Sequence, residues 1–392
     1  MARKISSQTR CIGILTSGGD CPGLNAAIRG VAKAAIGRHN MRVIGFLDGF
    51  RGLAENRVIE LDDRAVSGIL TSGGTILGTS RDKLAKMKIG QEKLDMAGVA
   101  AENLKRHHVD CLVCLGGGGT LKNAMHLHTT TGIDVITLPK TIDNDVAGTD
   151  ISFGFDSAMN IATEALDRLH TTATSHHRII VCEIMGHNAG WLALGSGIAG
   201  GADIILIPEI PYDLEKVAEH LLERRRHGKR FSIVAVAEGA LSVKEAREEI
   251  RRLAKEKEQE KMQERVKKGS EAQVKKAKNQ PDLEEIHLVA EPKSSRIARQ
   301  LQQLTGTEAR VTTLGHVQRG GPPSPYDRLL CSVLGTHAAD LIANHEYNVM
   351  VGIHNEKPVP VPIGEIVGKK KLVPANHPWV TAACNTGAFL GN

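Results

Sequence analysis

The fold class is decided by one stretch near the N-terminus, CIGILTSGGDCPGLNAAIRG at residues 11–30. Residues 11–16 are mostly apolar or β-branched, as in a buried strand, and a glycine-rich loop separates them from a helical pattern. A strand, a glycine loop and a helix in this order present backbone N–H groups and the positive end of a helix dipole to an anion. We therefore expect a phosphate site in the loop of residues 16–23, which includes Gly18, Gly19 and Gly23. An ordinary tight βα turn is the alternative, but such a turn needs one glycine rather than three.

The same alternation of patterns continues along the chain. Strands are expected at residues 11–16, 42–47, 109–115, 134–138, 178–184, 203–207, 231–237, 310–313 and 348–353. Helices are expected between them, at residues 24–38, 120–128, 157–170, 188–198, 214–228, 294–304 and 325–344. This order is typical of βαβ units and mainly parallel sheets that are buried on both faces. The length of 392 residues fits two such sheets, which predicts an α/β protein with two Rossmann-like, three-layer α/β/α domains.

Composition excludes several classes of function. The apolar runs are far shorter than the roughly 20 residues of a membrane-spanning helix, and no signal-peptide core follows the basic N-terminus. Seven cysteines, an odd number, fit reduced thiols, so we expect a cytoplasmic protein with no membrane partner. The net charge of +6 arises mainly at residues 244–278, where 13 Lys or Arg face 8 Asp or Glu. With six Phe, three Tyr and two Trp there is no stacking platform, and we expect no nucleic-acid partner.

The charged segment at about 244–280 has too few apolar residues to form a buried helical face. We interpret it as a solvated helical insertion. A docking surface for a partner is the alternative.

A second glycine loop follows the expected strand 109–115, with four consecutive glycines before Thr120. Four glycines have a large entropic penalty in folding, which indicates that a ligand, most naturally a phosphate, comes close to this backbone. Neither glycine loop has the spacing of a Walker A motif. A formal G-x-G-x-x-G begins at Gly195, but it follows a helical pattern and precedes a strand. That is the reverse of the dinucleotide-binding order, so the dehydrogenase interpretation is rejected.

Charged groups follow other strands at the same edge. The stretch PKTIDND at residues 139–145 places carboxylates beside a lysine, a combination that suits phosphoryl transfer, although Asx turns alone would also explain it. The stretch LGHVQRGG at residues 314–321 offers cations around a glycine pair, where a solvated basic loop is the alternative. Cys111 and Cys114 resemble half a zinc site, but a strand points residues three apart to opposite faces, so core packing is favoured.

Taken together, these stretches resemble the 6-phosphofructokinases, from residue 11 to about residue 355. The motifs that carry the resemblance are TSGGDCPGLNAAIRG, GGTILGTSR, PKTIDND, the run from SFGFDSA to SHHRI, EIMGHNAGWLA, VAEGA and LGHVQRGGPPSPYDR. The resemblance implies transfer of a phosphoryl group to the 1-hydroxyl of fructose 6-phosphate, with Mg²⁺, in a cleft between the two domains. It also implies the division of the chain: residues 1–154 plus about 318–368 for the donor, and about 155–317 plus 369–392 for fructose 6-phosphate.

The resemblance also implies roles for single residues. Asp143 matches the catalytic base, beside Thr141 and Lys140. The sugar-phosphate contacts implied are Thr141, Asp143, Arg178, Met185, Gly186, His187, Glu238, Arg310, His316 and Arg319. Of these, Arg178 and Arg310 match arginines that reach in from a neighbouring subunit, which implies a homo-oligomer, a dimer or a tetramer. The donor side matches Gly19, Arg81, Gly117, Gly118, Gly119 and Thr120.

Three departures from the family pattern bear on the chemistry. Gly118 stands where bacterial ATP enzymes commonly carry an aspartate that helps to hold Mg²⁺, which leaves Asp143 and Asp145 as its candidate ligands. His187 stands where many members carry arginine. Pyrophosphate-using relatives carry aspartate at the position of Gly119 and lysine at the position of Lys140.

The last departure bears on the donor. A glycine at 119 leaves space for a nucleotide α-phosphate, and ATP enzymes of the mixed-substrate subgroup combine that glycine with that lysine. This favours ATP over pyrophosphate. A catalytically silent, regulatory member of the family is a further alternative, supported by Gly118 and opposed by the intact Asp143, Arg178, Arg310 and Arg319.

Overall fold

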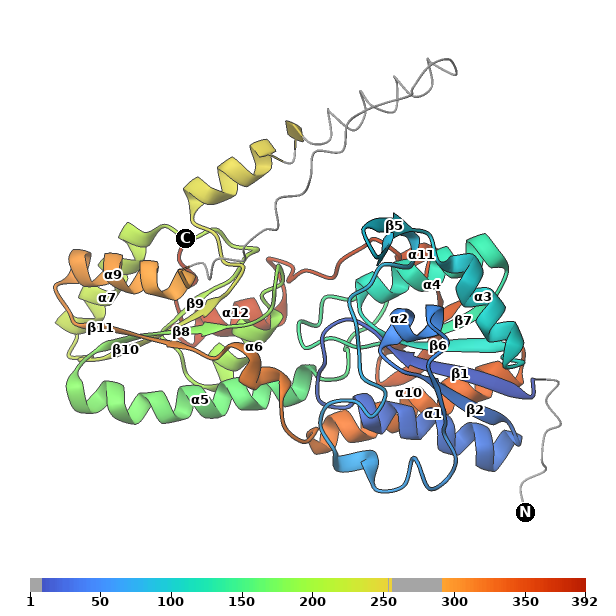
Figure 1. The fold of residues 1–392 in the computed structure, drawn as a ribbon. Coiled ribbons are helices and arrows are strands. Elements are labelled where there is room, and N and C mark those ends of the chain that lie inside the picture. Colours follow the sequence, from blue (N-terminus) through green and yellow to red (C-terminus); the bar gives the residue numbers. More distant parts are fainter. Residues whose placement is uncertain (1–8, 253, 256–290) are drawn as a thin grey trace, which may run out of the picture.

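The computed structural model describes residues 9–252, 254–255 and 291–392 (Figure 1). Its larger sheet has the strand order β13-β12-β7-β6-β1-β2-β3. The strands are β1 (Cys11–Thr16), β2 (Arg42–Phe46), β3 (Val58–Glu60), β6 (Cys111–Gly116), β7 (Asp134–Pro139), β12 (Val349–His354) and β13 (Lys357–Pro362). Neighbouring strands are parallel except at the two edges, where β3 and β13 pair antiparallel. A separate hairpin joins β4 (Met87–Ile89) and β5 (Glu92–Leu94).

Helices cover both faces of the larger sheet (Figure 1). One face carries α1 (Leu24–His39) and α10 (Pro325–Ala343), and the other carries α2 (Gly49–Ala54), α3 (Ala97–Arg106), α4 (Gly118–Thr131) and α11 (Ile363–Ile366). The backbones of α1 and α10 come very close, because a Cβ on Gly335 would lie 2.7 Å from the backbone nitrogen of Val31. This contact packs α10, which is distant from α1 in sequence, onto the larger sheet.

The smaller sheet has the order β11-β8-β10-β9, and all its pairs are parallel. Its strands are β8 (Ile179–Ile184), β9 (Ile204–Leu206), β10 (Ser232–Ala237) and β11 (Ala309–Thr313). One face is covered by α5 (Phe155–His176) and α6 (Trp191–Ala199), the other by α7 (Leu214–Arg226) and α9 (Lys293–Thr305), as Figure 1 shows. The last helix, α12 (Pro378–Asn385), packs against α6. Short 3₁₀ turns are η1 (Ile69–Thr71), η2 (Leu84–Lys86) and η3 (Gly315–Arg319).

The predicted fold class, two α/β units with mainly parallel sheets, is confirmed, and each strand and helix expected from the sequence is present. The predicted domain boundaries stay a prediction. They are supported by the return of β12 and β13 to the larger sheet and by a hydrogen bond of 3.0 Å from the Ile205 nitrogen to the Phe389 carbonyl, which ties the C-terminal residues to β9.

Two sequence interpretations concern particular segments. Residues 243–252 of the charged insertion are helical, and residues 256–280 of that prediction lie outside the described residues. Cys111 and Cys114 are both buried and belong to different hydrophobic clusters on the two faces of β6, as the alternation of a strand requires. Within the described residues, no helix combines the length and apolar character needed to cross a bilayer.

Candidate active site

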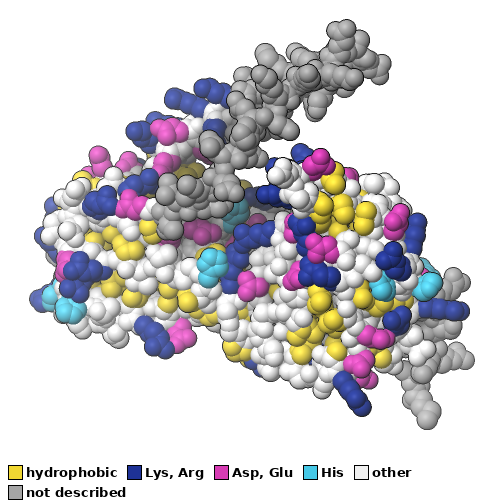
Figure 2. Space-filling model, in the orientation of Figure 1, with side chains coloured by type: hydrophobic (Ala, Val, Ile, Leu, Met, Phe, Trp, Pro, Cys, Tyr) yellow, Lys and Arg dark blue, Asp and Glu magenta, His cyan; other side chains and the backbone are white. Residues whose placement is uncertain are grey.

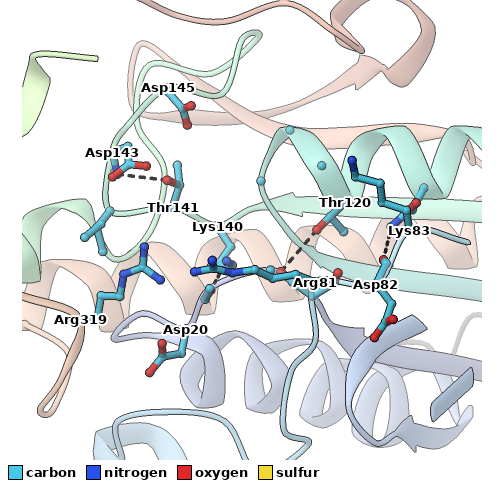
Figure 3. Close-up of a pocket in the computed structure, with 18 residues that line it drawn as sticks. Asp20, Arg81, Asp82, Lys83, Thr120, Lys140, Thr141, Asp143, Asp145 and Arg319 are labelled. Atoms are coloured by element: carbon cyan, nitrogen blue, oxygen red, sulfur yellow. Dashed lines mark hydrogen bonds between the residues drawn. The ribbon is translucent and has the colours of Figure 1, made fainter. Parts of the chain in front are cut away.

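A cavity of about 270 Å³ opens at the carboxyl ends of β1, β6 and β7 (Figure 3). Ligands bind at this edge of open parallel sheets, because the glycine-rich turns and helix N-termini that follow the strands face it. The lining residues are Ser17, Gly18, Gly19, Asp20, Arg81, Asp82, Lys83, Gly117, Gly118, Gly119, Thr120, Asn123, Lys140, Thr141, Ile142, Asp143, Asp145 and Arg319. The structure thus brings together both glycine loops, the PKTIDND loop and one arginine of the LGHVQRGG stretch.

The first glycine loop is shaped by close contacts. Gly18 adopts a φ of 91°, which favours glycine, and its nitrogen donates a hydrogen bond of 2.8 Å to the Ser80 carbonyl. A Cβ on Gly19 would lie 2.1 Å from Nη1 of Arg319. The glycine at 19 therefore makes room for this guanidinium, whereas the glycine at 18 is required by the backbone.

The second glycine loop opens α4. Gly117 is the N-cap residue and no side chain caps the helix, so the first N–H groups of α4 have no side-chain partner. Gly116 is required by packing, since a Cβ there would lie 1.9 Å from Thr120 Oγ1. A Cβ on Gly118 or Gly119 would meet no atom within 4 Å. The fold itself does not require glycine at these two positions, which agrees with a space kept for a ligand.

Asp143 lies in the loop after β7, on the cavity wall. Its backbone nitrogen donates a hydrogen bond of 3.0 Å to Thr141 Oγ1, and its Oδ1 is buried without a hydrogen-bond partner among the described residues. The pKa of the carboxyl group is raised to about 6, mainly by burial and also by the nearby carboxylates of Asp145 and Glu238, whereas Arg319 and His187 act in the opposite direction. A carboxylate with a raised pKa and a free oxygen is suited to accept a proton from a bound hydroxyl group.

Lys140 is buried between the two glycine loops. Its Nζ donates to the Gly19 carbonyl, and its own backbone nitrogen donates to the Gly116 carbonyl at 3.1 Å. Burial lowers the pKa of the ammonium group, as does the neighbouring Arg319. Lys140 therefore braces the first loop, with its ammonium group at the cavity wall.

Further cations line the cavity. Arg81 and Arg319 extend into it from opposite sides in Figure 3, and the Nε of Arg319 is buried without a partner among the described residues. On the face drawn in Figure 2, Lys and Arg side chains gather where the two halves of the molecule meet. Asn123 on α4 fixes the segment after Arg81, because its Nδ2 donates to the Asp82 carbonyl at 3.0 Å and its Oδ1 accepts from the Leu84 nitrogen at 3.1 Å.

The predicted sugar-phosphate residues lie mainly beyond this cavity, at the carboxyl ends of β8 and β10. The His187 nitrogen donates a hydrogen bond of 2.7 Å to Glu238 Oε1, with Gly186 and His187 both at positive φ. Met185 is nearly buried. Glu238 and His187 are near enough to Asp143 to affect its pKa, although neither lines the cavity. His316 is exposed on η3 and does not line the cavity.

Arg178 and Arg310 lie at the amino-terminal end of the strands of the smaller sheet, opposite to the carboxyl ends of those strands. Arg178 directly precedes β8, and Arg310 pairs in register with Ile180 at the start of that strand. Both arginines bind Glu308, which accepts from Arg178 Nε at 2.6 Å. A strand of six residues spans about 20 Å, so these guanidinium groups are far from the site of their own chain. The structure does not bring them to the other predicted residues.

Three lining residues, Asp82, Lys83 and Asn123, lie outside the stretches singled out from the sequence, whereas Ser17, Asp20 and Ile142 lie within those stretches but were not named as site residues. Asp82 and Lys83 follow directly on the GGTILGTSR stretch, which was the available signal. Asp82 forms an ion pair with Arg51, whose Nη2 donates a hydrogen bond of 2.6 Å to Asp82 Oδ1. This hydrogen bond lowers the pKa of the Asp82 carboxyl group. Asn123 carried no signal, because its role depends on a loop 40 residues away.

The donor set fits Mg²⁺ only in part. Among the described residues no three His, Cys, Asp or Glu side chains form a metal-binding group. Asp143 and Asp145 are close enough for their charges to interact, and no described residue forms a hydrogen bond with Oδ1 of Asp143. Two carboxylates of this kind suit Mg²⁺, which keeps several waters and is bound through one or two carboxylates plus substrate phosphates.

Comparison with known proteins places these features in context. Residues 11–342 match the family model described as Phosphofructokinase. A protein of Propionibacterium freudenreichii subsp. shermanii, named ATP-dependent 6-phosphofructokinase, is 52% identical over 97% of this chain and 99% of its own length. A protein of Spirochaeta thermophila with the same name is 49% identical over 98% of each chain.

Two solved structures share the fold. The phosphofructokinase of Pichia pastoris, in the T-state, is 30% identical with a TM-score of 0.72 over 97% of this chain, which spans 37% of that longer chain. A pyrophosphate-dependent phosphofructokinase of Nitrosospira multiformis has a TM-score of 0.75 at 19% identity, over 97% of this chain and 91% of its own. At that identity the second likeness shows the fold alone.

Proposed function

Because this chain belongs to the phosphofructokinase family, we propose that it transfers the γ-phosphoryl group of ATP to the 1-hydroxyl of fructose 6-phosphate. The products are fructose 1,6-bisphosphate and ADP, in a step of glycolysis. The assignment of ATP as the phosphoryl donor is supported by the two relatives of 52% and 49% identity, both named ATP-dependent 6-phosphofructokinase. The pyrophosphate alternative is not favoured. We propose a cytoplasmic location together with this activity.

The mechanism rests on the environment of the Asp143 carboxyl group. Its Oδ1 is buried without a hydrogen-bond partner in the described part of the chain, and its pKa of about 6 leaves the carboxyl group ionised at neutral pH yet basic enough to accept a proton. In the proposed step the oxygen of the 1-hydroxyl forms a bond to the γ-phosphorus while Asp143 takes its proton. The bond between that phosphorus and the bridging β–γ oxygen breaks, and the oxygen leaves on ADP.

The cavity around Asp143 supplies positioning and charge. Phosphoryl transfer is catalysed mainly by alignment and by groups that stabilise charge on the transferring phosphate. The uncapped N–H groups of α4 and the guanidinium of Arg319 face this space. Mg²⁺ held by Asp143 and Asp145 would neutralise charge on the donor phosphates. The sugar phosphate binds on the other side of the cavity. Its contacts are Thr141 beside Asp143, Glu238 and the segment Met185–His187.

The site is completed by a second copy of the chain. Arg178 and Arg310 lie at the amino-terminal end of the strands of the smaller sheet, away from the cavity of their own chain. The exposed fractions of their side chains are 25% and 57%, so both are accessible. Cations so placed serve a substrate phosphate only if a neighbouring subunit presents its site to them. A homodimer or a homotetramer provides this arrangement.

The proposal is tested by turnover of the purified protein with ATP, fructose 6-phosphate and Mg²⁺, with identification of the sugar bisphosphate formed. Fructose 1,6-bisphosphate should appear at a rate that depends on Asp143. A wild-type protein that binds both substrates without turnover would support the silent, regulatory alternative instead.

A further inference from the structure

The chain crosses from the larger to the smaller sheet between α11 and α12, in the red segment of Figure 1. We call residues 370–373 the crossing segment. The Lys371 nitrogen donates a hydrogen bond of 2.9 Å to the Asp145 carbonyl, and Lys370 forms an isolated bridge with Val146. The crossing segment therefore lies directly against the loop that carries Asp143.

The side chain of Lys371 reinforces this contact. Its Nζ donates three hydrogen bonds, to Asn144 Oδ1 at 2.9 Å, to the Thr149 carbonyl at 3.0 Å and to the Asp150 carbonyl at 2.7 Å. All three acceptors belong to the loop between β7 and α5. An ammonium group has three N–H donors, so Lys371 is fully used here.

Asn144 transmits the contact to the carboxylates. It lies between Asp143 and Asp145 with a positive φ of 52°, and its Oδ1 also accepts from the Ser152 nitrogen at 3.0 Å. Ser152 Oγ in turn donates to the Thr141 carbonyl at 2.9 Å. A shift of the Lys371 ammonium would thus move the backbone on both sides of Asp143.

The crossing segment also forms hydrogen bonds with residues of the unit that contains the smaller sheet. The Lys371 carbonyl accepts from Trp191 Nε1 at 3.0 Å, and Lys371 Nζ lies 5.5 Å from the centroid of the Trp191 ring. Glu209 Oε1 accepts from both the Gly190 and the Val373 nitrogens, at 3.0 Å each. Gly190 and Trp191 begin α6, directly after the segment with Met185 and His187.

We propose that Lys371 is a positioning residue that fixes the loop carrying Asp143 relative to the start of α6, and so aligns the catalytic base with the sugar phosphate. Its consequence for turnover rests on the proposed function, whereas its effect on the loop does not.

The kinetic test compares Lys371→Met with Lys370→Met. The control removes an equal charge from the exposed neighbouring residue. We expect Lys371→Met to lower kcat at least about tenfold with less than about a threefold change in KM for ATP, because small misplacements of reacting groups slow catalysis strongly. Equal kcat values in the two folded variants would overturn the proposal and leave the proposed function intact.

A second test does not depend on activity. Amide hydrogen exchange at residues 141–152 should be at least about tenfold faster in Lys371→Met than in Lys370→Met, as expected for a loop that opens locally more often. Unchanged exchange there would contradict the positioning role. Should the wild type fail to phosphorylate fructose 6-phosphate, the proposed function fails, and this exchange measurement alone decides the role of Lys371.

Discussion

Gly19 and Arg319 share one space in the candidate site: a methyl group on residue 19 would lie 2.1 Å from Nη1 of the arginine. The first glycine loop and η3 are 300 residues apart in sequence, and this contact sets where the guanidinium lies in the cavity. The absence of a side chain at 19 therefore has a functional reason, since the end of a flexible arginine could move aside without disturbing the fold.

We predict that Gly19→Ala lowers kcat/KM at least about tenfold, equivalent to about 1.4 kcal/mol, by displacing Arg319, with little change in thermal stability. The informative control is the same substitution in an Arg319→Ala background, measured by steady-state kinetics. There the alanine at 19 has no guanidinium to displace, and its effect should largely disappear. Additive effects of the two substitutions would mean that Gly19 acts independently of Arg319.

Asp143→Asn should lower kcat about 10² or more while sugar-phosphate affinity changes little, because positioned general bases contribute about 10² to 10⁴. The matched control is Asp20→Asn, which removes an exposed carboxylate from the same cavity. Near-normal turnover of Asp143→Asn would remove this residue from the mechanism.

The raised pKa of Asp143 also predicts a dependence on pH. The carboxyl group has a pKa of about 6 when folded against a reference value of 3.8, so the folded protein binds the extra proton between these values and loses stability as pH rises through them. Asp143→Asn should therefore raise the free energy of unfolding at pH 7 by about 1 to 3 kcal/mol.

This gain should vanish below about pH 4, where both states are protonated. Thermal unfolding of wild type and variant between about pH 4 and 8 measures it. In the wild type, kcat/KM should fall below about pH 6, since a protonated Asp143 cannot accept a proton. A gain in stability that is independent of pH would show that Asp143 is not the group responsible.

Arg178 and Arg310 predict complementation between subunits. Asp143→Asn and Arg178→Ala proteins should each be nearly inactive, and mixing them under conditions of subunit exchange should restore some activity through sites that combine intact residues of both copies. Exchange is verified with differently tagged subunits. If exchange is complete and activity does not return, each chain uses its own arginines or none.

Gly118 and Gly119 allow a clean test of donor and metal, because a Cβ at either position meets nothing within 4 Å and aspartate is favourable in the first turn of a helix. Gly119→Asp should cut ATP use at least about tenfold by filling the α-phosphate space and repelling its charge, while Gly119→Asn separates volume from charge. Gly118→Asp should instead lower the Mg²⁺ concentration for half-maximal rate, by adding a carboxylate. An unchanged Mg²⁺ requirement would place the ion away from residue 118.

Much of the fold was predictable because its signals are local. Buried strands such as β6 are continuous apolar runs, and glycine-rich turns mark the ends of the strands that form the cavity. β13 was missed because KPVPVP has three prolines, which a strand tolerates only at an edge, where half of its N–H groups need no partner.

The site was predictable as far as its residues lie in motifs. Asp143, Lys140 and Arg319 were named from their stretches, and the structure brings them to one cavity. Asn123 and Lys371 could not be found in this way, because their bonds join segments 39 to 227 residues apart and depend on the tertiary fold. The placement of Arg178 away from the cavity is likewise a property of sheet order and strand direction.

The most direct measurement is the initial rate of the wild-type protein with fructose 6-phosphate and Mg²⁺, compared between ATP and pyrophosphate at matched concentrations. The open space at Gly119 and the identity with relatives named for ATP predict a kcat/KM for ATP at least about tenfold above that for pyrophosphate, with fructose 1,6-bisphosphate as product. Faster turnover with pyrophosphate would show that Lys140 outweighs Gly119 as the determinant of the donor, and would contradict the account.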